Sequence, residues 1–150
     1  MRTIHRDIVS ALIFSKDRKI FQGMIRKGGA YPDCWHIPGG GIDDGENKDE
    51  ALIREIEEET GIDISSYDIE LVDDIGQGKS EKVLKDTGEK VLVEMNFYVY
   101  KVIIKDKIAD DIKIELKSDL VEYQWVNLKD LNKIKLTPPS VELFKRMNYI

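Results

Sequence analysis

Residues 39–62 read GGGIDDGENKDEALIREIEEETGI, in which three glycines and an acidic loop precede a segment dense in glutamate. Glu55, Glu58 and Glu59 stand at positions i, i+3 and i+4. On a helix, their carboxylates would gather within an arc of about 100°. Because like charges at this spacing weaken a helix, a purely structural segment has no need of them. The rest of the chain has to explain why they are there.

The glutamates lie in a predicted helix that spans residues 47–60 and ends at Gly61, a residue suited to the left-handed position after a helix. The apolar residues expected to face a sheet are Leu52, Ile53 and Ile56. Glu57 points away from the three clustered carboxylates. Arg54 lies at the edge of the cluster, where its guanidinium can orient a carboxylate or meet a phosphate.

Outside this helix, the sequence alternates between predicted strands and turns. Strands are expected at 8–14, 19–26, 35–38, 67–76, 91–104, 110–116 and 121–128. The polar, glycine-punctuated segment 76–90 is expected to be a long exposed loop or hairpin tip. A second helix is predicted to begin at Thr137, before two prolines. Strands before, between and after two helices predict one α/β domain over residues 1–150, with helices packed on a mixed sheet.

The composition limits the partners that the protein can have. Its 150 residues carry a net charge of −6 with a pI near 5.0, which argues against a nucleic-acid polymer or an anionic membrane as a partner. Cys34 is the single cysteine, so no intramolecular disulfide can form. The N-terminal segment predicts neither a membrane span nor a signal peptide, and we expect a cytoplasmic protein. The sequence leaves open whether it is a monomer or a homodimer.

Three carboxylates at helical spacing offer the hard oxygen ligands that Mg²⁺ and Mn²⁺ prefer. Two such cations would neutralise a diphosphate, polarise a phosphorus–oxygen bond and lower the pKa of an attacking water. A sharp turn at residues 39–41 would let bare backbone approach the helix and expose carbonyls to a metal or amides to a phosphate. A negatively charged protein could therefore hold polyphosphate through metal ions.

The spacing of these residues resembles that of a known family. From Gly40 onward the chain fits GX5EX7REUXEEXGU, where U is aliphatic, which is the pattern of the Nudix hydrolases, including MutT-like proteins. The matching residues are Gly40, Glu46, Arg54, Glu55, Ile56, Glu58, Glu59, Gly61 and Ile62. WHIPGG before this pattern and SDLVEYQWVNLKDL near the C-terminus also resemble parts of the family, so the likeness covers nearly the whole chain in outline.

This resemblance implies an α/β/α sandwich with a mixed sheet and a Mg²⁺-dependent hydrolase of nucleoside diphosphates linked to another group. Glu55, Glu58 and Glu59 would be metal ligands, joined by the Gly40 carbonyl. Glu46 would be a further ligand or a carboxylate behind the ligands. The resemblance also implies that Arg54 orients the glutamates.

The general base varies between branches of the family, and the sequence offers two carboxylates besides those on the helix. Asp119 lies six residues before Trp125, where it is either a loop base or an ordinary turn residue. Glu94 lies on the polar face of the strongest predicted strand and could reach the cleft. Candidates for stacking on a nucleobase are Trp35, Tyr31 and Phe21, although such aromatics also commonly fill core or edge positions.

The substrate is approached by elimination. The patterns typical of the NADH, coenzyme A, ADP-ribose and dinucleoside polyphosphate branches are absent. The leading hypothesis is a nucleoside triphosphate, an oxidised one included, cleaved to the monophosphate and pyrophosphate. One alternative is a pyrophosphatase acting on a nucleotide sugar, ADP-ribose or a dinucleoside polyphosphate. Another is a non-catalytic, nucleotide-binding regulatory domain, although such domains often lose a glutamate of the pattern and none is lost here.

Overall fold

The computed structural model describes residues 1–26 and 31–150 of the chain. Within these residues, eight strands form one mixed sheet. The strands are β1 (Arg2–Ser15), β2 (Lys19–Met24), β3 (Trp35–His36), β4 (Gly39–Gly41), β5 (Ile69–Asp73), β6 (Gln77–Val83), β7 (Lys90–Ile104) and β8 (Glu122–Asn127). The order is β3-β2-β1-β7-β5, and β4 also pairs with β1, β6 with β7 and β8 with β2. β1 and β7 run parallel, whereas the other pairs are antiparallel.

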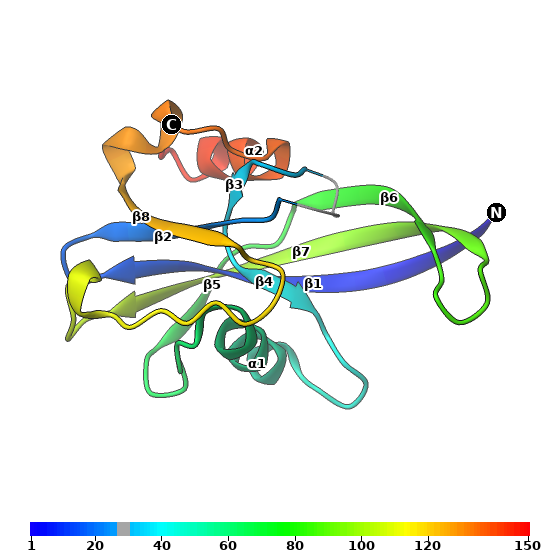
Figure 1. The fold of residues 1–150 in the computed structure, drawn as a ribbon, viewed down its shortest axis with the longest axis horizontal. Coiled ribbons are helices and arrows are strands. Elements are labelled where there is room, and N and C mark those ends of the chain that lie inside the picture. Colours follow the sequence, from blue (N-terminus) through cyan, green and yellow to red (C-terminus); the bar gives the residue numbers. More distant parts are fainter. Residues whose placement is uncertain (27–30) are drawn as a thin grey trace.

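Helices cover both faces of this sheet, α1 (Lys48–Thr60) on one and α2 (Pro138–Arg146) on the other (Figure 1). Successive side chains of a strand point to opposite faces. On β1, Ala11 and Ile13 therefore pack in the core beneath α1, and Leu12 packs in the core beneath α2. The predicted α/β/α sandwich with a mixed sheet is confirmed. Among the described residues, no helix has the length and hydrophobicity that a membrane crossing requires.

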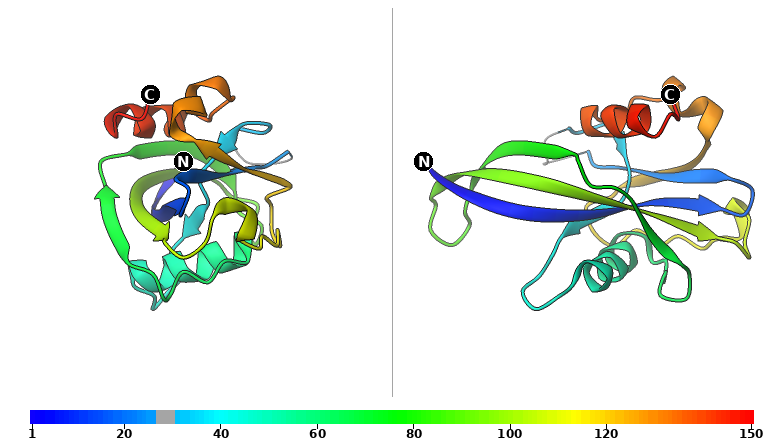
Figure 2. Two further views of the ribbon diagram at one scale, coloured as in Figure 1. Left: turned by 90° about the vertical axis from the view of Figure 1, so that its left-hand side faces the viewer. Right: turned by 180° about the vertical axis from the view of Figure 1, so that it is seen from behind.

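Three strands extend well beyond the helices (Figures 1 and 2). Residues 2–7 of β1, residues 90–96 of β7 and the whole of β6 form this projection, which we call the arm. The pairing of β1 with β7 runs unbroken from Arg2 opposite Val91 to Ser15 opposite Ile104. The arm is thus a direct continuation of the central strands of the sheet.

The arm corrects two sequence expectations. β1 begins at Arg2 rather than at residue 8, because its polar first half pairs with β7 instead of packing in the core. Residues 77–83, expected in an exposed loop or hairpin tip, form β6, antiparallel to β7. β6 is mostly exposed and carries little apolar pattern, so the backbone ladder is what holds it as a strand.

The strand predicted at 110–116 is wrong. Ala109–Asp111 forms a 3₁₀ turn, and the residues that follow lie outside the sheet. Ile112, Ile114 and Leu116 alternate because they pack against the α1-side core, and Glu115 N–H donates to the Thr60 carbonyl at 2.8 Å. The alternating pattern therefore comes from an irregular segment, residues 112–116, that packs along the core and the end of α1.

Both ends of α1 are fixed by local chemistry. At its start, the Asn47 side chain accepts from Glu50 N–H at 2.8 Å, and the Glu50 carboxylate accepts from Asn47 N–H at 3.2 Å. This reciprocal pair satisfies two donors that a helix start would otherwise leave open. At its end, Gly61 has φ of 78°, a conformation that glycine adopts without strain. The helix is therefore set in a definite register against the sheet.

We expect Asn47→Ala to lower the free energy of unfolding by about 1 kcal/mol, because the Glu50 N–H loses its acceptor. Asn47→Ser keeps a side-chain oxygen at this position and should stay close to the wild type. Urea unfolding followed by circular dichroism measures both. An equal loss of unfolding free energy in the two variants would mean that the side-chain oxygen at position 47 does not stabilise α1.

Candidate active site

α1 divides into an apolar side and an acidic side, as its sequence predicts. Leu52 and Ile56 are fully buried, and Ile53 packs against the same core while partly exposed. On the other side, Glu58 is about half exposed, with 53% of its side chain accessible, whereas Glu59 is only 8% exposed. The glutamates thus range from solvent to the interior of the protein.

The three glycines form strand β4, not the sharp turn expected from the sequence. Residues Gly39–Gly41 pair with Ser10, Val9 and Ile8 of β1. The close backbone approach to the helix is nevertheless present. Gly39 N–H donates to Glu59 Oε1 at 2.7 Å, and a Cβ on Gly40 would collide with the Glu55 carboxylate. Bare backbone is therefore required where β4 passes over α1.

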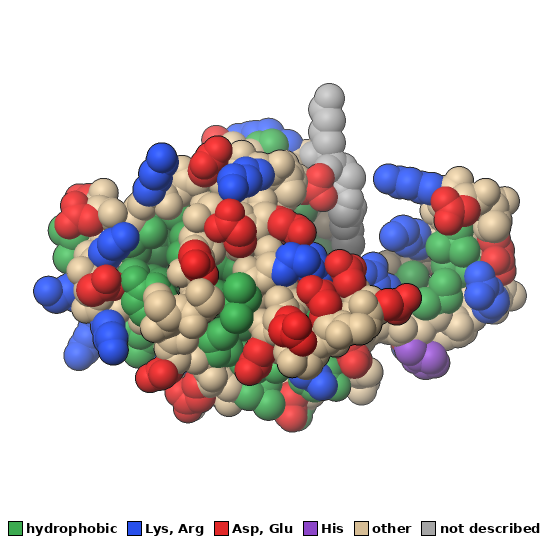
Figure 3. All heavy atoms as spheres, turned by 90° about the horizontal axis from the view of Figure 1, so that it is seen from below, with side chains coloured by type: hydrophobic (Ala, Val, Ile, Leu, Met, Phe, Trp, Pro, Cys, Tyr) green, Lys and Arg blue, Asp and Glu red, His purple; other side chains and the backbone are tan. Residues whose placement is uncertain are grey.

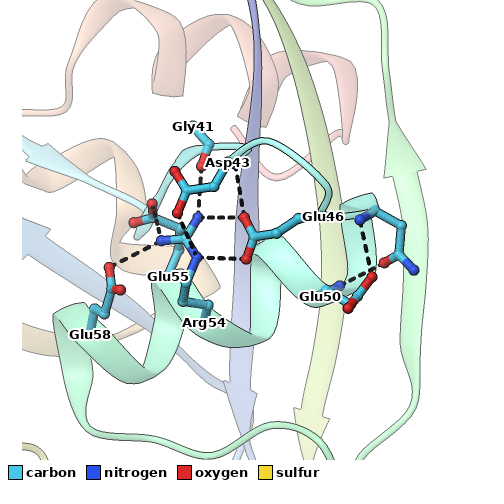
Figure 4. A network of polar contacts seen from close by, with 8 residues as sticks. Gly41, Asp43, Glu46, Glu50, Arg54, Glu55 and Glu58 are labelled. Atoms are coloured by element: carbon cyan, nitrogen blue, oxygen red, sulfur yellow. Dashed lines mark hydrogen bonds and ion pairs between the residues drawn. The ribbon is translucent and has the colours of Figure 1, made fainter.

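Arg54 lies at the centre of the acidic side and bonds to most of it (Figure 4). Its Nε and Nη2 donate to the two oxygens of Glu46 at 2.7 and 2.9 Å, a bidentate pair. Its Nη1 donates to Glu55 at 2.9 Å and to Glu58 at 3.2 Å. Nη2 also donates to the Gly41 carbonyl at 3.0 Å. One guanidinium thus contacts three carboxylates, and the orienting role that the resemblance implies for Arg54 stays a prediction.

The network shifts the pKa of its members in opposite directions. Hydrogen bonds from Arg54 hold the pKa of Glu46 below its ordinary value, and the bond to Glu46 holds the pKa of Arg54 above its own. Burial raises the pKa of Glu55, although Arg54 opposes the rise. Glu46 thus favours its charged form, whereas the positive charge of Arg54 only partly offsets the cost of burying a negative charge on Glu55.

Glu59 is the most perturbed carboxyl of the cluster. Burial raises its pKa to about 8, against the lowering effect of the hydrogen bond from Gly39. The negative charges of Glu55, Asp119 and Glu58 add to the rise. The loop residue Asp119 therefore lies near enough to act on Glu59, although 60 positions separate them in the sequence. A buried carboxylate that faces three other negative groups is a place where a cation would be stabilised.

The donor set fits a divalent cation. Among the residues that the structure describes, no three acidic, histidine or cysteine side chains converge on one point as a ready metal site. Instead the positive Arg54 guanidinium stands between Glu55 and Glu58. The carboxylates are hard oxygen donors, and the absent Cβ of Gly40 leaves the Glu55 carboxylate open to the β4 backbone. Whether Glu55, Glu58, Glu59, Gly40 and Glu46 bind metal stays a prediction.

The remaining predicted site residues are spread over the fold. Tyr31 is 43% exposed, and Trp35 in β3 is partly buried, with its backbone bonded to Lys135 and Thr137. The prediction for Phe21 fails, because its ring is completely buried and presents no surface to a nucleobase. Its neighbours are Tyr123, whose ring stacks on it at 5.8 Å, and Trp125, which meets it edge-on at 5.4 Å.

Glu94 lies on the arm rather than beside the glutamates of α1. Its carboxylate is 3.2 Å from His5 Nδ1 and 3.7 Å from Lys79 Nζ. Sequence reasoning also missed Asp43, whose carboxylate lies 3.4 Å from Arg54 Nε. The available signal was its position in the acidic loop, where it shares hydrogen bonds with Glu46 in both directions.

The family model described as the NUDIX domain matches residues 4–147. The chain belongs to the Nudix family. It is 30% identical over 128 residues to an RNA pyrophosphohydrolase of a Nitratiruptor species, covering 85% of this chain and 81% of that protein. It is also 30% identical over 129 residues to the nucleoside triphosphatase NudI of Escherichia coli (strain K12), covering 84% of each. As a Nudix hydrolase, it acts on phosphorus-containing anhydrides.

The fold comparison agrees with this membership. The crystal structure of a MutT protein from Methanosarcina mazei Go1 superposes with a TM-score of 0.69 at 22% identity. The alignment covers 99% of this chain and 96% of that one. The eight strands and two helices described above are therefore arranged as in a Nudix protein.

The raised pKa of Glu59 predicts a pH-dependent stability of the metal-free protein. A carboxyl that titrates higher in the folded than in the unfolded chain stabilises the fold below its unfolded pKa, and this contribution is lost as the pH rises through about 8. In EDTA, we expect the melting temperature to fall between pH 6 and pH 9. Glu59→Gln should flatten this fall, because the amide remains neutral throughout.

The control for this measurement is Glu57→Gln on the same helix. Glu57 is 46% exposed and pairs with Lys117 at 3.0 Å, so its loss should leave the slope of melting temperature against pH unchanged. Added Mg²⁺ should raise the melting temperature of the wild type most at the alkaline end. Equal slopes of melting temperature against pH in the wild type and Glu59→Gln would contradict the raised pKa of Glu59.

Proposed function

We propose that this Nudix hydrolase cleaves nucleoside triphosphates to the monophosphate and pyrophosphate in a reaction that requires Mg²⁺ or Mn²⁺. The observation that carries the proposal is the carboxylate cluster of α1, held by Arg54 and touched by the glycine backbone of β4. The name of the relative NudI, a nucleoside triphosphatase at 30% identity, supports the substrate class. Oxidised nucleotides are included in the proposal.

Glu55, Glu58 and Glu59, with the Gly40 carbonyl, are the residues that would hold the metal, and Glu46 would support them. A bound divalent cation would supply positive charge to the polyphosphate and lower the pKa of the attacking water. The fit rests on hard oxygen donors gathered beside an exposed backbone segment. It also explains why a chain with a net charge of −6 would take a highly anionic substrate.

The chain's own residues would perform the remaining tasks. Arg54 keeps Glu55 and Glu58 in place through hydrogen bonds of 2.9 and 3.2 Å. Asp119, whose charge already acts on Glu59, would accept the proton of the attacking water. The water oxygen forms a bond to the α-phosphorus, and the bond from that phosphorus to the oxygen that bridges it to the β-phosphorus breaks. Pyrophosphate leaves with the bridging oxygen, and the monophosphate remains.

A substrate panel tests the proposal. It contains normal and oxidised nucleoside triphosphates, ADP-ribose, nucleotide sugars, dinucleoside polyphosphates and a short RNA with a 5′ triphosphate, each with and without Mg²⁺. We expect nucleoside triphosphates to turn over fastest, with a phosphate signal that needs added pyrophosphatase. Preference for ADP-ribose, a nucleotide sugar, a dinucleoside polyphosphate or RNA would reassign the substrate. Metal-dependent binding without any turnover would favour a regulatory domain.

We further expect Glu58→Gln to lower kcat at least about a hundredfold, because a metal ligand loses its charge. Glu57→Gln is the matched control on the neighbouring position of the helix, where the side chain turns to Lys117, and it should hydrolyse at the wild-type rate. Initial rates on the best substrate of the panel, at saturating Mg²⁺, give the comparison. Unchanged hydrolysis by Glu58→Gln would remove the glutamate cluster from the reaction.

A further inference from the structure

A groove separates the arm from the start of α1. It has a volume of about 460 Å³. One wall is residues 5–7 of β1, and the other is the loop that joins β4 to α1 with the first residue of the helix. The lining residues are His5, Arg6, Asp7, Ile42, Asp43, Asp44, Gly45, Glu46, Asn47 and Lys48. Only Ile42 in this lining is strongly apolar, so the groove suits a polar, charged ligand group better than a nucleobase.

The groove is continuous with the glutamate cluster. Glu46 and Asp43 line it and are the carboxylates that bond to Arg54 from the loop side. Seen from the side of α1, acidic and basic side chains gather next to the hollow between the body and the arm (Figure 3). A substrate whose reacting phosphorus lies at the glutamates could therefore extend into this groove.

Arg6 is the cation on the arm side of the groove. Its side chain is exposed, and its Nη2 packs on Gly41 where a Cβ would otherwise lie. Within the described chain, Arg6 forms no ion pair, whereas Arg2 on the same face of β1 is paired with Glu89 at 2.8 Å. An exposed arginine held beside a glycine but left without a carboxylate has donors free for a ligand.

Gly41 brings Arg6 close to the network of Arg54. The Gly41 carbonyl accepts from Arg54 Nη2 at 3.0 Å, while the Arg6 guanidinium packs against the α-carbon of the same residue. The carboxylate contacts of the cluster, with Asp43, Glu46, Glu55 and Glu58, all belong to Arg54. Two guanidinium groups thus meet at one glycine, and only one of them is neutralised.

Lys48 is the cation of the opposite wall. It is the first residue of α1, where the helix dipole disfavours a positive charge. Its Nζ is nevertheless held 4.6 Å above the centre of the Tyr98 ring. Because Lys48 lines the groove, this lysine adds positive charge to the wall formed by the loop and the start of α1.

We propose that Arg6, assisted by Lys48, binds the terminal phosphoryl group of the substrate and so selects chains of three phosphates over chains of two. This deepens the proposed function and rests on it for the position of the reacting phosphorus. Asp7 and Asp44 also line the groove, so the phosphate would arrive with its Mg²⁺ rather than as a bare anion. Arg6 is a specificity-determining contact, and hydrolysis itself remains the task of the α1 glutamates.

The test compares Arg6→Ala and Arg6→Lys with Arg2→Ala, a matched control on the same strand and face. We expect Arg6→Ala to raise the KM for a nucleoside triphosphate about tenfold, the size of one charged hydrogen bond, and to leave kcat nearly unchanged. The KM for the corresponding diphosphate should stay as in the wild type. Arg6→Lys should recover part of the loss, Lys48→Ala should show a smaller effect of the same kind, and Arg2→Ala should show none.

A binding measurement separates this proposal from the proposed function. Calorimetry with Mg²⁺ and the α,β-methylene analogues of the tri- and diphosphate needs no turnover, so it tests Arg6 even if nucleoside triphosphates are not hydrolysed. We expect wild-type protein to prefer the triphosphate analogue and Arg6→Ala to lose most of that preference. An equal loss for both analogues, the same loss in Arg2→Ala, or no preference in the wild type would overturn the proposal.

Discussion

The attachment of carboxylates to Arg54 is the interaction on which the site depends. Glu46, Glu55 and Glu58 reach the guanidinium from a loop and from two turns of α1, at distances of 2.7 to 3.2 Å. Without this central charge, the acidic side of the helix would repel itself. The pairing is only partial, because the pKa of Glu55 still lies above its ordinary value. The site is held together yet remains attractive to further cations.

The glycines of β4 set the distance between this helix and the sheet, and each is required by a different neighbour. A Cβ on Gly39 would meet the Val9 and Ser10 backbone, one on Gly40 the Glu55 carboxylate, and one on Gly41 the Arg6 guanidinium. The first contact keeps β4 in the sheet, the second brings backbone to the helix, and the third packs the arm against the site. One short strand therefore joins three parts of the protein.

Features fixed by local chemistry were predictable from the sequence, and features fixed by pairing were not. The ends of α1 follow from Asn47 and Gly61, and its acidic side follows from helical spacing. By contrast, β6 is a strand because its backbone pairs with β7, and its polar sequence gives no sign of that pairing. Glu94 shares a face of β7 with Tyr100 and Val102, which pack in the α1-side core instead of forming a polar face, and the register of that strand with β1 places Glu94 on the arm. Phe21 was a reasonable aromatic candidate, but its complete burial excludes it.

The same distinction applies to function. The spacing of glutamates along α1 predicts the chemistry, and this prediction can be made from residues 40–62 alone because they form one helix with the strand and loop that lead into it. Selection of the substrate depends on what lies beside that helix, and here the neighbour is the arm. Arg6 is 48 positions before Arg54 in the sequence, and only the register of β1 against β4 brings both to Gly41. Substrate preference can therefore differ between proteins that share the whole glutamate pattern, because the residues that meet the far end of the substrate belong to a different part of the sheet.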